Sequence, residues 1–495
     1  MEYNEVMKFA LQKGFYFPSC DIYSDKSAGF WEYGPLGVNF KNNFIDLWRS
    51  ELIRRDEVLE IDGSQIMSKS VFTASGHLTN FADPIIKCKE CSSTFRVDKL
   101  LMEKINININ ENEPLQKYDE IITKNNICCT KCNGKFFNSS RFNMMFSIGI
   151  GPENEVAYLR PETCQSIFVD FPRLFKTMRG KLPFGIAQIG KSFRNEIAPR
   201  QSILRLREFY QAEIEIFCNP NNFNSFTKFS QVANTTIRLY VDNKTKTMSC
   251  KEAVDSKIIP NIFIAYYIGL LTEFYAKTGI DMSKTRFRKL SDDEKAFYST
   301  SSFDFEVKTA VGWLELVACN YRTNYDLIHH ANVSKENYYV LDGEDKIMPH
   351  VFEISMGIDR SLYSILEHSL KNDSGNKRTL LALQPYLSPI YVGVLSLLKK
   401  DGLEEKTNEI YTQIKKKFTV FLDHAGTIGR RYRRLDEIGA PFAITIDYQT
   451  LKDQTVTMRM RDNMNQIRIQ ISEIEKFLTT NILIPHNAIK SKYPR

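Results

Sequence analysis

Residues 185–217 read GIAQIGKSFRNEIAPRQSILRLREFYQAEIEIF, and their alternation predicts two strands joined by a charged loop. In the second strand one face carries Arg205, Arg207, Phe209, Gln211 and Glu213, and the other face carries mostly apolar side chains: Leu206, Tyr210, Ala212, Ile214 and Ile216. In the first strand Ser192, Arg194 and Glu196 share a face, opposite Phe193 and Asn195. Because guanidinium groups bind phosphate oxygens in pairs and an aromatic ring can stack on a base, this hairpin predicts a site for a nucleoside triphosphate. The alternative is a half-exposed hairpin whose charges are solvated.

The length and composition restrict the class of protein only broadly. A chain of 495 residues is expected to form two to four domains, and its net charge of +7 permits an RNA partner without requiring one. The sequence contains no apolar run long enough to span a bilayer, and its first residues lack the pattern of a secretory signal, so we expect a cytoplasmic protein that does not use a membrane. Ten cysteines in such a chain indicate core thiols and metal ligands instead of disulfides.

The hairpin carries a family resemblance. Phe193-Arg194-x-Glu196, followed by a loop and by Arg205-x-x-x-Phe209, resembles motif 2 of the class II aminoacyl-tRNA synthetases, and the surrounding sequence is similar to that of the homodimeric glycyl-tRNA synthetases. The resemblance implies an α+β fold, with a class II catalytic domain built on an antiparallel β-sheet flanked by helices, and a C-terminal α/β domain that binds the anticodon.

The N-terminal segment is predicted to contribute strands, turns and one long helix. Residues 14–37 are aromatic and rich in Gly and Pro, which indicates strands and turns, and the apolar spacing of residues 38–55 predicts a helix. Residues 58–84 fit a strand and an ordered loop. This helix followed by a strand is similar to motif 1, which implies a homodimer interface, although the Pro common at the end of that motif is missing. The alternative is an amphipathic helix that packs within its own chain.

Two further stretches resemble parts of a glycine pocket. In residues 157–169, AYLRPETCQSIFV, Glu162 stands between a predicted strand and a predicted helix, and Cys164 replaces the Ala usual in the family. The resemblance implies that Glu162 receives the α-ammonium group of the amino acid. Arg96, Asp98 and Leu100 resemble an R-x-D-x-L element that contributes its Arg to the substrate pocket; the alternative is an exposed Arg on a ribbon edge.

The stretch from residue 301 to residue 370 is predicted to complete the nucleotide site. Strand alternation places Glu315 on the same face as Trp313 and Val317. Glu353 and Ser355 share a face of a later strand, and Arg360 follows in the first turn of a helix, in a G-x-D-R arrangement that resembles motif 3. Because a cation is unfavourable at a helix N-terminus, we expect an anion beside Arg360, a role that a triphosphate can fill.

The resemblance implies specific roles for these residues. The implied catalytic residues are Arg194, Glu196 and Arg360. The implied ATP-binding residues are Arg194, Asn195, Glu196, Leu204, Arg205, Phe209, Glu315, Leu316, Gly357 and Arg360. The implied glycine-binding residues are Arg96, Glu162, Phe209, Gln211, Glu213, Arg322, Glu353 and Ser355. ATP and Mg²⁺ are the implied cofactors, with the Glu315 carboxylate holding Mg²⁺ against the phosphates.

Two C-x-x-C pairs predict a structural metal site. Cys88, Cys91, Cys129 and Cys132 have the spacing of a four-thiolate zinc ribbon, which leaves no open coordination position for chemistry. Two alternatives stay open: Cys128 replaces Cys129 as a ligand, or the thiols hold no metal. The Asn- and Ile-rich residues 103–126 between the pairs are expected to form an adaptable insertion.

We expect two domains joined at a polar hinge over residues 371–380. The catalytic domain covers residues 1–372, with a zinc-ribbon-like insertion at 86–136 and a helical insertion at 219–295 that covers the active site or touches RNA. Residues 381–495 alternate strands and helices, ending in a helix over 463–478, and predict a small α/β domain with a mixed sheet. A basic cluster there, with one later arginine, is implied to bind tRNA: Arg430, Arg431, Arg433 and Arg459. The alternative for the cluster is a solvated helix face.

The function that follows is ATP-dependent attachment of glycine to tRNA(Gly) through a glycyl-adenylate. Two alternatives have different consequences. One is a non-catalytic, RNA-binding accessory subunit with the same fold, and the other is a class II synthetase for another small amino acid such as Ser, Thr or Pro.

Overall fold

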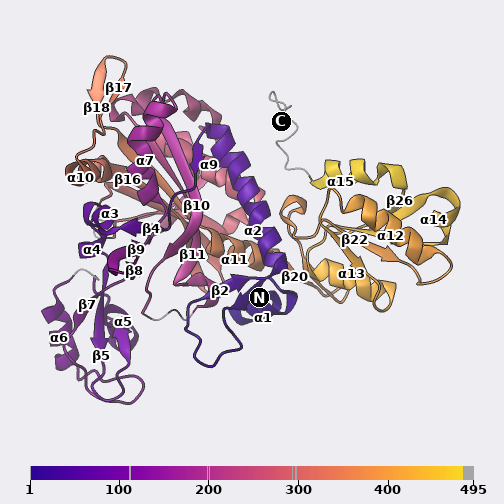
Figure 1. The fold of residues 1–495 in the computed structure, drawn as a ribbon, viewed down its shortest axis with the longest axis horizontal. Coiled ribbons are helices and arrows are strands. Elements are labelled where there is room, and N and C mark those ends of the chain that lie inside the picture. The colour runs from indigo at the N-terminus through magenta and orange to yellow at the C-terminus, as the bar shows by residue number, and fades with distance from the viewer. Residues whose placement is uncertain are drawn as a thin grey trace.

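The computed structural model describes residues 2–110, 113–197, 199, 201–291, 294–295 and 298–482. The chain forms a large domain built on one sheet, a small ribbon attached to it, and a C-terminal domain (Figure 1). The predicted C-terminal domain reaches residue 495, and its residues 483–495 lie outside the described part. None of the described helices is both long and apolar enough to cross a membrane.

A nine-stranded sheet forms the large domain. Its strands are antiparallel except for two parallel pairs, β3 with β10 and β12 with β14. In spatial order the strands are β13 (Lys244–Ser249), β12 (Thr236–Val241), β14 (Thr285–Lys289), β15 (Ser301–Thr309), β16 (Gly312–Thr323), β19 (His350–Gly357), β11 (Glu208–Cys218), β10 (Phe184–Phe193) and β3 (Leu59–Ile61). The predicted hairpin of residues 185–217 is confirmed as β10 and β11, which pair from Phe184–Phe217 to Phe193–Glu208.

Helices cover both faces of this sheet. The main core lies between the sheet and three helices, α2 (Pro35–Trp48), α9 (Ile262–Lys277) and α11 (Ile358–Ser369). Two other helices, α7 (Cys164–Thr177) and α10 (Tyr325–Ser334), pack on the opposite face of β10, β11 and β19. Because side chains alternate along β11, Ala212 and Ile214 enter the main core, whereas Phe217 points to the α7 face.

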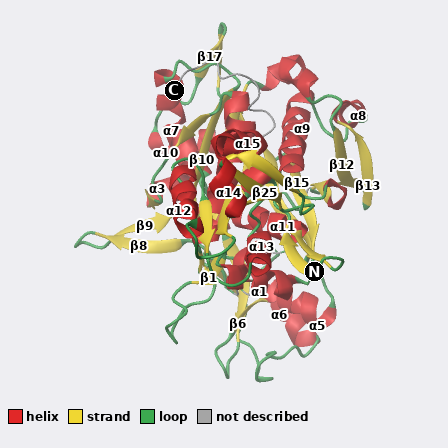
Figure 2. Cartoon of the chain, turned by 90° about the vertical axis from the view of Figure 1, so that its right-hand side faces the viewer, coloured by secondary structure: helices red, strands yellow, loops and turns green. Residues whose placement is uncertain are grey.

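The N-terminal segment follows its prediction with one difference. After α1 (Tyr3–Lys13) come the short strands β1 (Tyr16–Pro18) and β2 (Trp31–Tyr33), and α2 continues as one π-helical segment, Arg49–Arg54. The expected loop within 58–84 instead contains two short helices, α3 (Lys69–Ala74) and α4 (His77–Asn80). Strand β4 (Ile66–Ser68) pairs with the hairpin of β8 (Phe146–Ile150) and β9 (Glu155–Leu159), which projects from the domain on the side opposite to β12 and β13 (Figure 2).

Two expectations about insertions are corrected. Residues 219–295 are not simply helical, because β12, β13 and β14 extend the main sheet and α9 packs within its core. The ribbon contains β5 (Ala82–Lys87), β6 (Thr94–Arg96) and β7 (Ser140–Asn143), with α5 (Val97–Ile105) and α6 (Leu115–Lys124). Helix α6 lies within the Asn- and Ile-rich segment and buries Tyr118 and Ile122, so this segment supplies part of the ribbon's own core.

The C-terminal domain has the predicted mixed sheet, ordered β23 (Val420–Asp423), β22 (Val392–Ser396), β24 (Phe442–Ile446), β25 (Thr455–Met460) and β26 (Gln466–Gln470). Its helices are α12 (Leu403–Ile414), α13 (Ile428–Glu437), α14 (Tyr448–Asp453) and α15 (Ile474–Ile482). The helix predicted over 463–478 was wrong in its first half, where β26 pairs with β25 and so supplies an edge strand. The expected polar hinge is a hairpin of β20 (Leu370–Asp373) and β21 (Arg378–Leu381).

Candidate active site

A cavity of about 280 Å³ lies on the α7 face of the sheet, where β11, β16, β19 and the first turn of α11 meet. Fourteen of the predicted ATP- and glycine-binding residues line it: Glu162, Arg194, Glu196, Leu204, Arg205, Phe209, Gln211, Glu213, Glu315, Leu316, Glu353, Ser355, Gly357 and Arg360. The structure therefore brings together residues that are up to 198 positions apart in the chain, from Glu162 to Arg360.

The loop of the β10–β11 hairpin holds its charged groups in place. The Glu196 carboxylate accepts hydrogen bonds from Arg205, at 2.8 Å from Nε and 2.6 Å from Nη2. Arg194 donates from Nε to the Pro161 carbonyl at 3.1 Å, and its guanidinium lies 5.2 Å from the centre of the Phe209 ring. Arg205 and Arg194 remain partly exposed to the cavity, so both are available to an anionic ligand.

The prediction that Arg207 shares a strand face with Arg205 and Phe209 was wrong. Strand β11 begins only at Glu208, so the alternation does not extend back to residues 205–207, and Leu206 lines the cavity beside Arg205. Arg207 points away and donates to the Glu196 and Ala28 carbonyls, each at 3.0 Å.

Glu315 and Arg360 stand together at the exposed end of the cavity. Arg360 donates from Nη1 to the Glu315 carbonyl at 3.2 Å, and the same nitrogen lies 3.5 Å from the Glu315 carboxylate. The Arg360 side chain is 37% exposed and the Glu315 side chain 47% exposed, so solvent and ligand reach both groups. A carboxylate oxygen in this position is a suitable ligand for Mg²⁺.

The prediction that Glu315 and Val317 share a face was wrong. The pairing of β15 with β16 shifts by one residue, so that Phe305 faces Val317 and Glu306 faces Glu315. This bulge inserts one extra residue in β16, which reverses the alternation. Val317 is therefore fully buried in the main core, while Glu315 faces the cavity.

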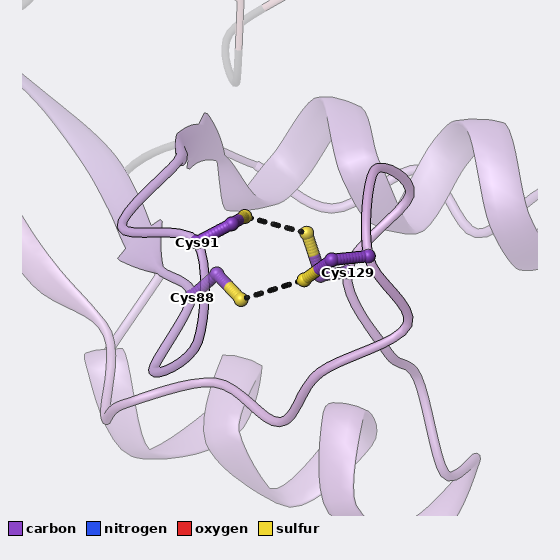
Figure 3. Close-up of side chains that lie close together, drawn as sticks. Cys88, Cys91 and Cys129 are labelled. Atoms are coloured by element: carbon purple, nitrogen blue, oxygen red, sulfur yellow. Dashed lines mark hydrogen bonds between the residues drawn. The ribbon is translucent and has the colours of Figure 1, made fainter.

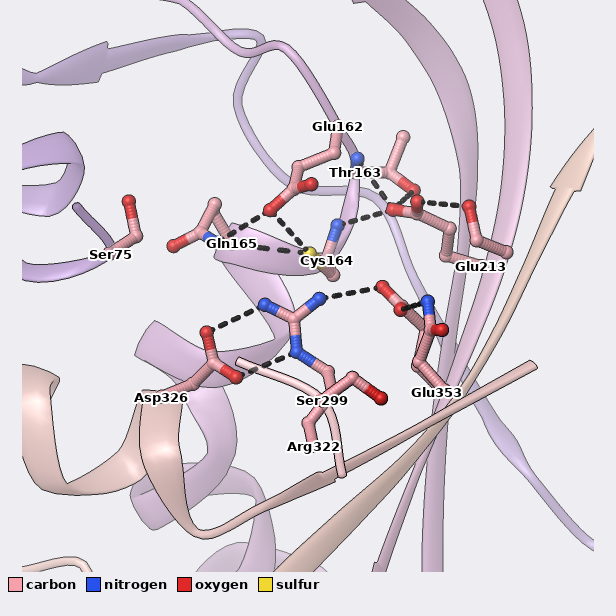
Figure 4. Close-up of polar contacts among 12 residues, drawn as sticks. Ser75, Glu162, Thr163, Cys164, Gln165, Glu213, Ser299, Arg322, Asp326 and Glu353 are labelled. Atoms are coloured by element: carbon pink, nitrogen blue, oxygen red, sulfur yellow. Dashed lines mark hydrogen bonds and ion pairs between the residues drawn. The ribbon is translucent and has the colours of Figure 1, made fainter. Parts of the chain in front are cut away.

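Acidic side chains gather at the inner end of the cavity (Figure 4). Glu213 accepts hydrogen bonds from Thr163 N and Cys164 N at 2.7 and 2.6 Å, and so caps the N-terminus of α7. Its other oxygen accepts from Ser355 Oγ at 2.6 Å. Because both oxygens are engaged, Glu213 fixes Ser355 and α7 relative to β11.

Arg322 is buried behind the cavity and orients Glu353 (Figure 4). Its guanidinium donates to both Asp326 oxygens at 2.7 Å and to Glu353 Oε1 at 2.8 Å, and it lies 3.7 Å from the Tyr298 ring centre. The second Glu353 oxygen accepts from Asn320 Nδ2 at 2.6 Å. Arg322 is thus not among the lining residues, and its predicted contact with substrate becomes an indirect one through Glu353.

The acidic groups titrate differently because their surroundings differ. Burial raises the pKa of Glu353 to about 7, although Arg322 and Asn320 oppose the rise. Burial also acts to raise the pKa of Glu162, but the charges of His77 and Arg322 hold it well below its usual range. The pKa of Glu215 is raised well above its usual value by burial and by the Glu353 charge, and neither of its oxygens has a hydrogen-bond partner among the described residues. The pKa values of the two carboxyl groups are therefore shifted in opposite directions, which favours the ionised form of Glu162 and the neutral form of Glu215.

Sequence reasoning missed several residues of this site. Tyr298 and Asn320 line the cavity, and His77 lies 3.4 Å from Glu162 while its Nδ1 lies 2.8 Å from Ser75 Oγ. Asn320 lies two residues before Arg322 on β16, where alternation after the bulge could have indicated it. Tyr298 and His77 come from segments without strand or helix periodicity, so the sequence carried no signal for them.

Besides Arg322, two predicted ATP- and glycine-binding residues lie outside the cavity. Arg96 is in the ribbon, where it pairs with Asp83 at 2.9 Å and with Asp98 at 2.8 Å, so it orders the ribbon instead of facing the substrate site. Asn195 turns away from the cavity lining and donates its backbone N–H to the Met144 carbonyl at 2.8 Å.

A larger cavity of about 760 Å³ lies at the opposite end of β10 and β11, beside α9. Its charged groups include Asp56 and Lys228, which pair with each other at 2.7 Å. Because the predicted ATP- and glycine-binding residues line the smaller cavity and not this one, we place the chemistry in the smaller cavity.

The sulfur atoms of the four predicted metal ligands lie close together, and Figure 3 labels three of these residues, Cys88, Cys91 and Cys129. The sulfur atoms of Cys88, Cys91, Cys129 and Cys132 all lie within 4.8 Å of one another, with Cys88–Cys132 at 3.5 Å and Cys91–Cys129 at 3.6 Å. Four sulfurs bound to one zinc ion at about 2.3 Å stand about 3.8 Å apart, so the arrangement fits a tetrahedral site. Cys128 does not belong to this cluster and contacts the Asn126 carbonyl, which decides between Cys128 and Cys129.

Two of the four predicted tRNA-binding arginines are buried. Arg431 is 4% exposed and donates to the Ser396 carbonyl at 2.6 Å, and Arg459 is 5% exposed and pairs with both oxygens of Asp436. These guanidinium groups therefore stabilise the domain itself, and their contact with RNA stays a prediction. Arg430 and Arg433 are exposed on α13, while the neighbouring Arg434, also exposed in part, pairs with Asp423.

Comparison with known proteins gives the same picture for the two main domains. Residues 148–369 match the family model of the tRNA synthetase class II core domain (G, H, P, S and T), and residues 391–481 match that of the anticodon binding domain. The chain is 36% identical to the glycine–tRNA ligase of Methanococcus maripaludis, covering 96% of this chain and 99% of the relative. It is 37% identical to the glycine–tRNA ligase of Archaeoglobus fulgidus, covering 97% and 96%.

Solved structures share the fold at lower identity. A threonyl-tRNA synthetase structure from Cryptosporidium parvum, described as its RNA binding domain, superposes with a TM-score of 0.60 at 18% identity and covers 96% of this chain and 98% of that chain. A prolyl-tRNA synthetase structure from the same organism gives 0.57 at 13% identity, covering 96% and 74%.

Proposed function

The chain belongs to the class II glycine–tRNA ligase family, and on that premise we propose that the cavity between β11, β16 and β19 joins glycine to ATP and then to tRNA. One observation carries the proposal. Arg194, Arg205 and Arg360 surround one end of the cavity, while Glu162 and Glu353 stand at the other. A triphosphate and an ammonium group therefore each find groups of opposite charge within one site.

The reaction has two steps. A carboxylate oxygen of glycine attacks the α-phosphorus of ATP, the bond to the bridging oxygen breaks, and pyrophosphate leaves with that electron pair. A hydroxyl oxygen of the terminal tRNA ribose then attacks the glycyl carbonyl carbon, loses its proton, and displaces AMP. Neither step needs a protein nucleophile, so catalysis rests on orientation and on charge stabilisation.

The cationic end orients the nucleotide. Arg194 is assigned to the α-phosphate, Arg205 and Arg360 to the outer phosphates, and Phe209 to the face of adenine. Glu196 supports Arg205 through their two short contacts, and so sets the direction of that guanidinium. The Glu315 carboxylate would hold Mg²⁺, and the ion would supply positive charge beside the phosphates.

The acidic end selects glycine. Glu162 and Glu353 accept the α-ammonium hydrogens, and Ser355 is held beside them by Glu213. Since a carboxylate or hydroxyl surrounds the α-carbon on several sides, a larger side chain is excluded sterically. Exclusion by size suffices here because every competing amino acid is larger than glycine.

Four further assignments complete the proposal. The four-cysteine cluster holds a structural zinc ion that stabilises the ribbon, as its sulfur spacing supports. The C-terminal domain contacts tRNA(Gly) through exposed residues that include Arg430 and Arg433. The protein acts in the cytoplasm.

The fourth assignment is a homodimer. The apolar side chains of α2, among them Phe40 and Phe44, are buried in their own chain, so that face of the helix is already used. A dimer would instead use the remaining surface beside β3, the strand at the outer edge of the sheet in the described part of the chain.

ATP–pyrophosphate exchange across a panel of amino acids tests the function. Exchange with glycine alone supports the proposal, whereas exchange with serine, threonine or proline would assign the pocket to another substrate. Absence of exchange with every amino acid, in a protein that still binds tRNA, would indicate a non-catalytic accessory subunit.

A further inference from the structure

Behind the catalytic cavity lies a second cavity of about 320 Å³, formed by the N-terminal strands and α2. The two cavities share four lining residues, Ile203, Leu206, Tyr210 and Asp359. Tyr33 from β2 and Lys41 from α2 enter the second cavity from the far side. None of the roles assigned above uses this N-terminal segment, although its side chains reach within one residue of Phe209 and of Arg360.

The side chain of Asp359 provides a hydrogen-bond acceptor for β11 beyond the end of β19. The ladder between β11 and β19 ends at Gln211–Gly357, where β19 turns into α11. The next residue of β11, Tyr210, donates its backbone N–H to Asp359 Oδ2 at 2.7 Å. A carboxylate in the first turn of α11 thus replaces the missing strand as the hydrogen-bond acceptor, and it fixes β11 against the helix that carries Arg360.

Tyr33 holds the other oxygen of this carboxylate by donating its hydroxyl hydrogen to Asp359 Oδ1. Burial raises the pKa of Tyr33 well above its usual value, so the hydroxyl keeps the proton that it donates. Burial also raises the pKa of Asp359 to about 6, against the effect of its two hydrogen bonds, so at pH 8 the carboxylate is ionised and accepts both.

Lys41 provides the nearby positive charge. Its Nζ lies 3.8 Å from the centre of the Tyr210 ring and 5.0 Å from that of Tyr33, so one cation contacts both rings. Such cation–π contacts are favourable, most when the cation is desolvated. The cation also offsets the charge of the buried Asp359 carboxylate, whose pKa it lowers.

We propose that Tyr33 and Lys41 are positioning residues of the ATP site, acting through Asp359 and Tyr210 on Arg360 and Phe209. The inference rests on the proposed function, because it takes Arg360 and Phe209 to be ATP-binding. The N-terminal segment touches neither substrate. In this proposal it sets the distance between β11, which carries the adenine-binding ring of Phe209, and α11, which carries the phosphate-binding Arg360.

The chain offers a matched control. Tyr16 pairs with Tyr33 across the β1–β2 ladder, with ring centres 5.2 Å apart, and its hydroxyl is buried without a hydrogen-bond partner among the described residues. Tyr33→Phe and Tyr16→Phe therefore remove the same atom from neighbouring rings, but only the first breaks a contact to Asp359.

The full-length protein is assayed by glycine-dependent ATP–pyrophosphate exchange at pH 8, with thermal unfolding of each variant as a check of folding. Tyr33→Phe is expected to raise KM for ATP about tenfold, the factor that corresponds to one hydrogen bond to a charged group, and to leave KM for glycine within about twofold. Tyr16→Phe should change neither constant by more than about twofold. Lys41→Met should raise KM for ATP about threefold, and Lys41→Arg should restore it.

Equal increases of both KM values in Tyr33→Phe would overturn the proposal, because a general loss of structure moves both. So would equal effects of Tyr33→Phe and Tyr16→Phe. If Tyr33→Phe does not fold, the Lys41 pair decides, and failure of Lys41→Arg to restore KM for ATP refutes the role. A wild-type protein that activates another amino acid contradicts the proposed function instead, and the same comparison is then made with that amino acid.

Discussion

Glu353→Gln is the substitution that most directly probes the proposed glycine site. Glu353 is 2% exposed, and its two oxygens accept hydrogen bonds from Arg322 and Asn320. Gln has nearly the same shape, and its amide oxygen can still accept from Arg322. The substitution therefore removes the negative charge that faces the ammonium group with little change in packing.

The size of the effect follows from the charge and the pKa. A hydrogen bond to a charged group contributes about 1.5–3 kcal/mol, so KM for glycine should rise about tenfold to 150-fold at pH 8. Because burial raises the pKa of Glu353 to about 7, the wild-type site is mostly ionised at pH 8 and mostly protonated at pH 6. If only the ionised form binds glycine, the competent fraction falls from about 90% to about 10%, and KM for glycine rises about tenfold between these two values.

The assay is ATP–pyrophosphate exchange with glycine varied at saturating ATP, from pH 6 to pH 8.5. Wild-type protein should show KM for glycine rising as the pH falls through 7, whereas Glu353→Gln should show a high and nearly constant value. KM for ATP should stay within about twofold for both proteins. A variant that keeps the wild-type pH dependence, or that changes both KM values equally, would refute the assignment of Glu353 to the ammonium group.

Three other predictions concern the remaining parts of the molecule. Arg194→Ala should abolish pyrophosphate exchange while thermal unfolding stays unchanged, and near-normal exchange would contradict its contact with the α-phosphate. Metal analysis of reduced protein should find one zinc ion per chain, and a strong chelator should lower the unfolding temperature of the ribbon; zinc well below one per chain would leave the four thiols without their proposed role. Replacing Arg430 and Arg433 by Gln should weaken tRNA charging and reduce its dependence on salt, without altering pyrophosphate exchange. Arg431→Gln should instead destabilise the C-terminal domain by about 3 kcal/mol in urea unfolding, because it leaves the Ser396 carbonyl without its buried partner.

The parts of the fold that the sequence predicted are those with a regular period. The β10–β11 hairpin carries an alternation and α11 an apolar stripe, and both elements were predicted, although β10 ends at Phe193 and β11 begins only at Glu208. The β16 face was wrong because one inserted residue reverses an alternation, and no propensity marks a bulge in a run of apolar residues. In β26 the apolar residues Ile467 and Ile469 fit either a strand or part of a helix, and only pairing with β25 decides.

The site was predicted where a residue's role depends on its own motif, and missed where the role depends on distant partners. The family resemblance gave Arg194, Glu353 and Arg360, which stand in recognisable strings. The burial of Arg459 was not predicted, because its partner, Asp436, lies on α13 and becomes a neighbour only in the folded domain. An exposed and a buried arginine look alike in sequence, and burial depends on contacts between elements.

The charges of the cavity also orient the substrate. Arg322 is a cation in the acidic end, but Asp326 takes two of its hydrogen bonds and Glu353 a third, so it leaves no positive charge free for a ligand. The acidic end thus attracts an ammonium group, and Arg194, whose guanidinium has no carboxylate partner among the described residues, also lines the cavity. Glycine is a zwitterion, and we infer that it binds with its ammonium group at Glu162 and its carboxylate towards Arg194. That direction points the attacking oxygen at the α-phosphate, so the distribution of charge that binds glycine also places it for the first step.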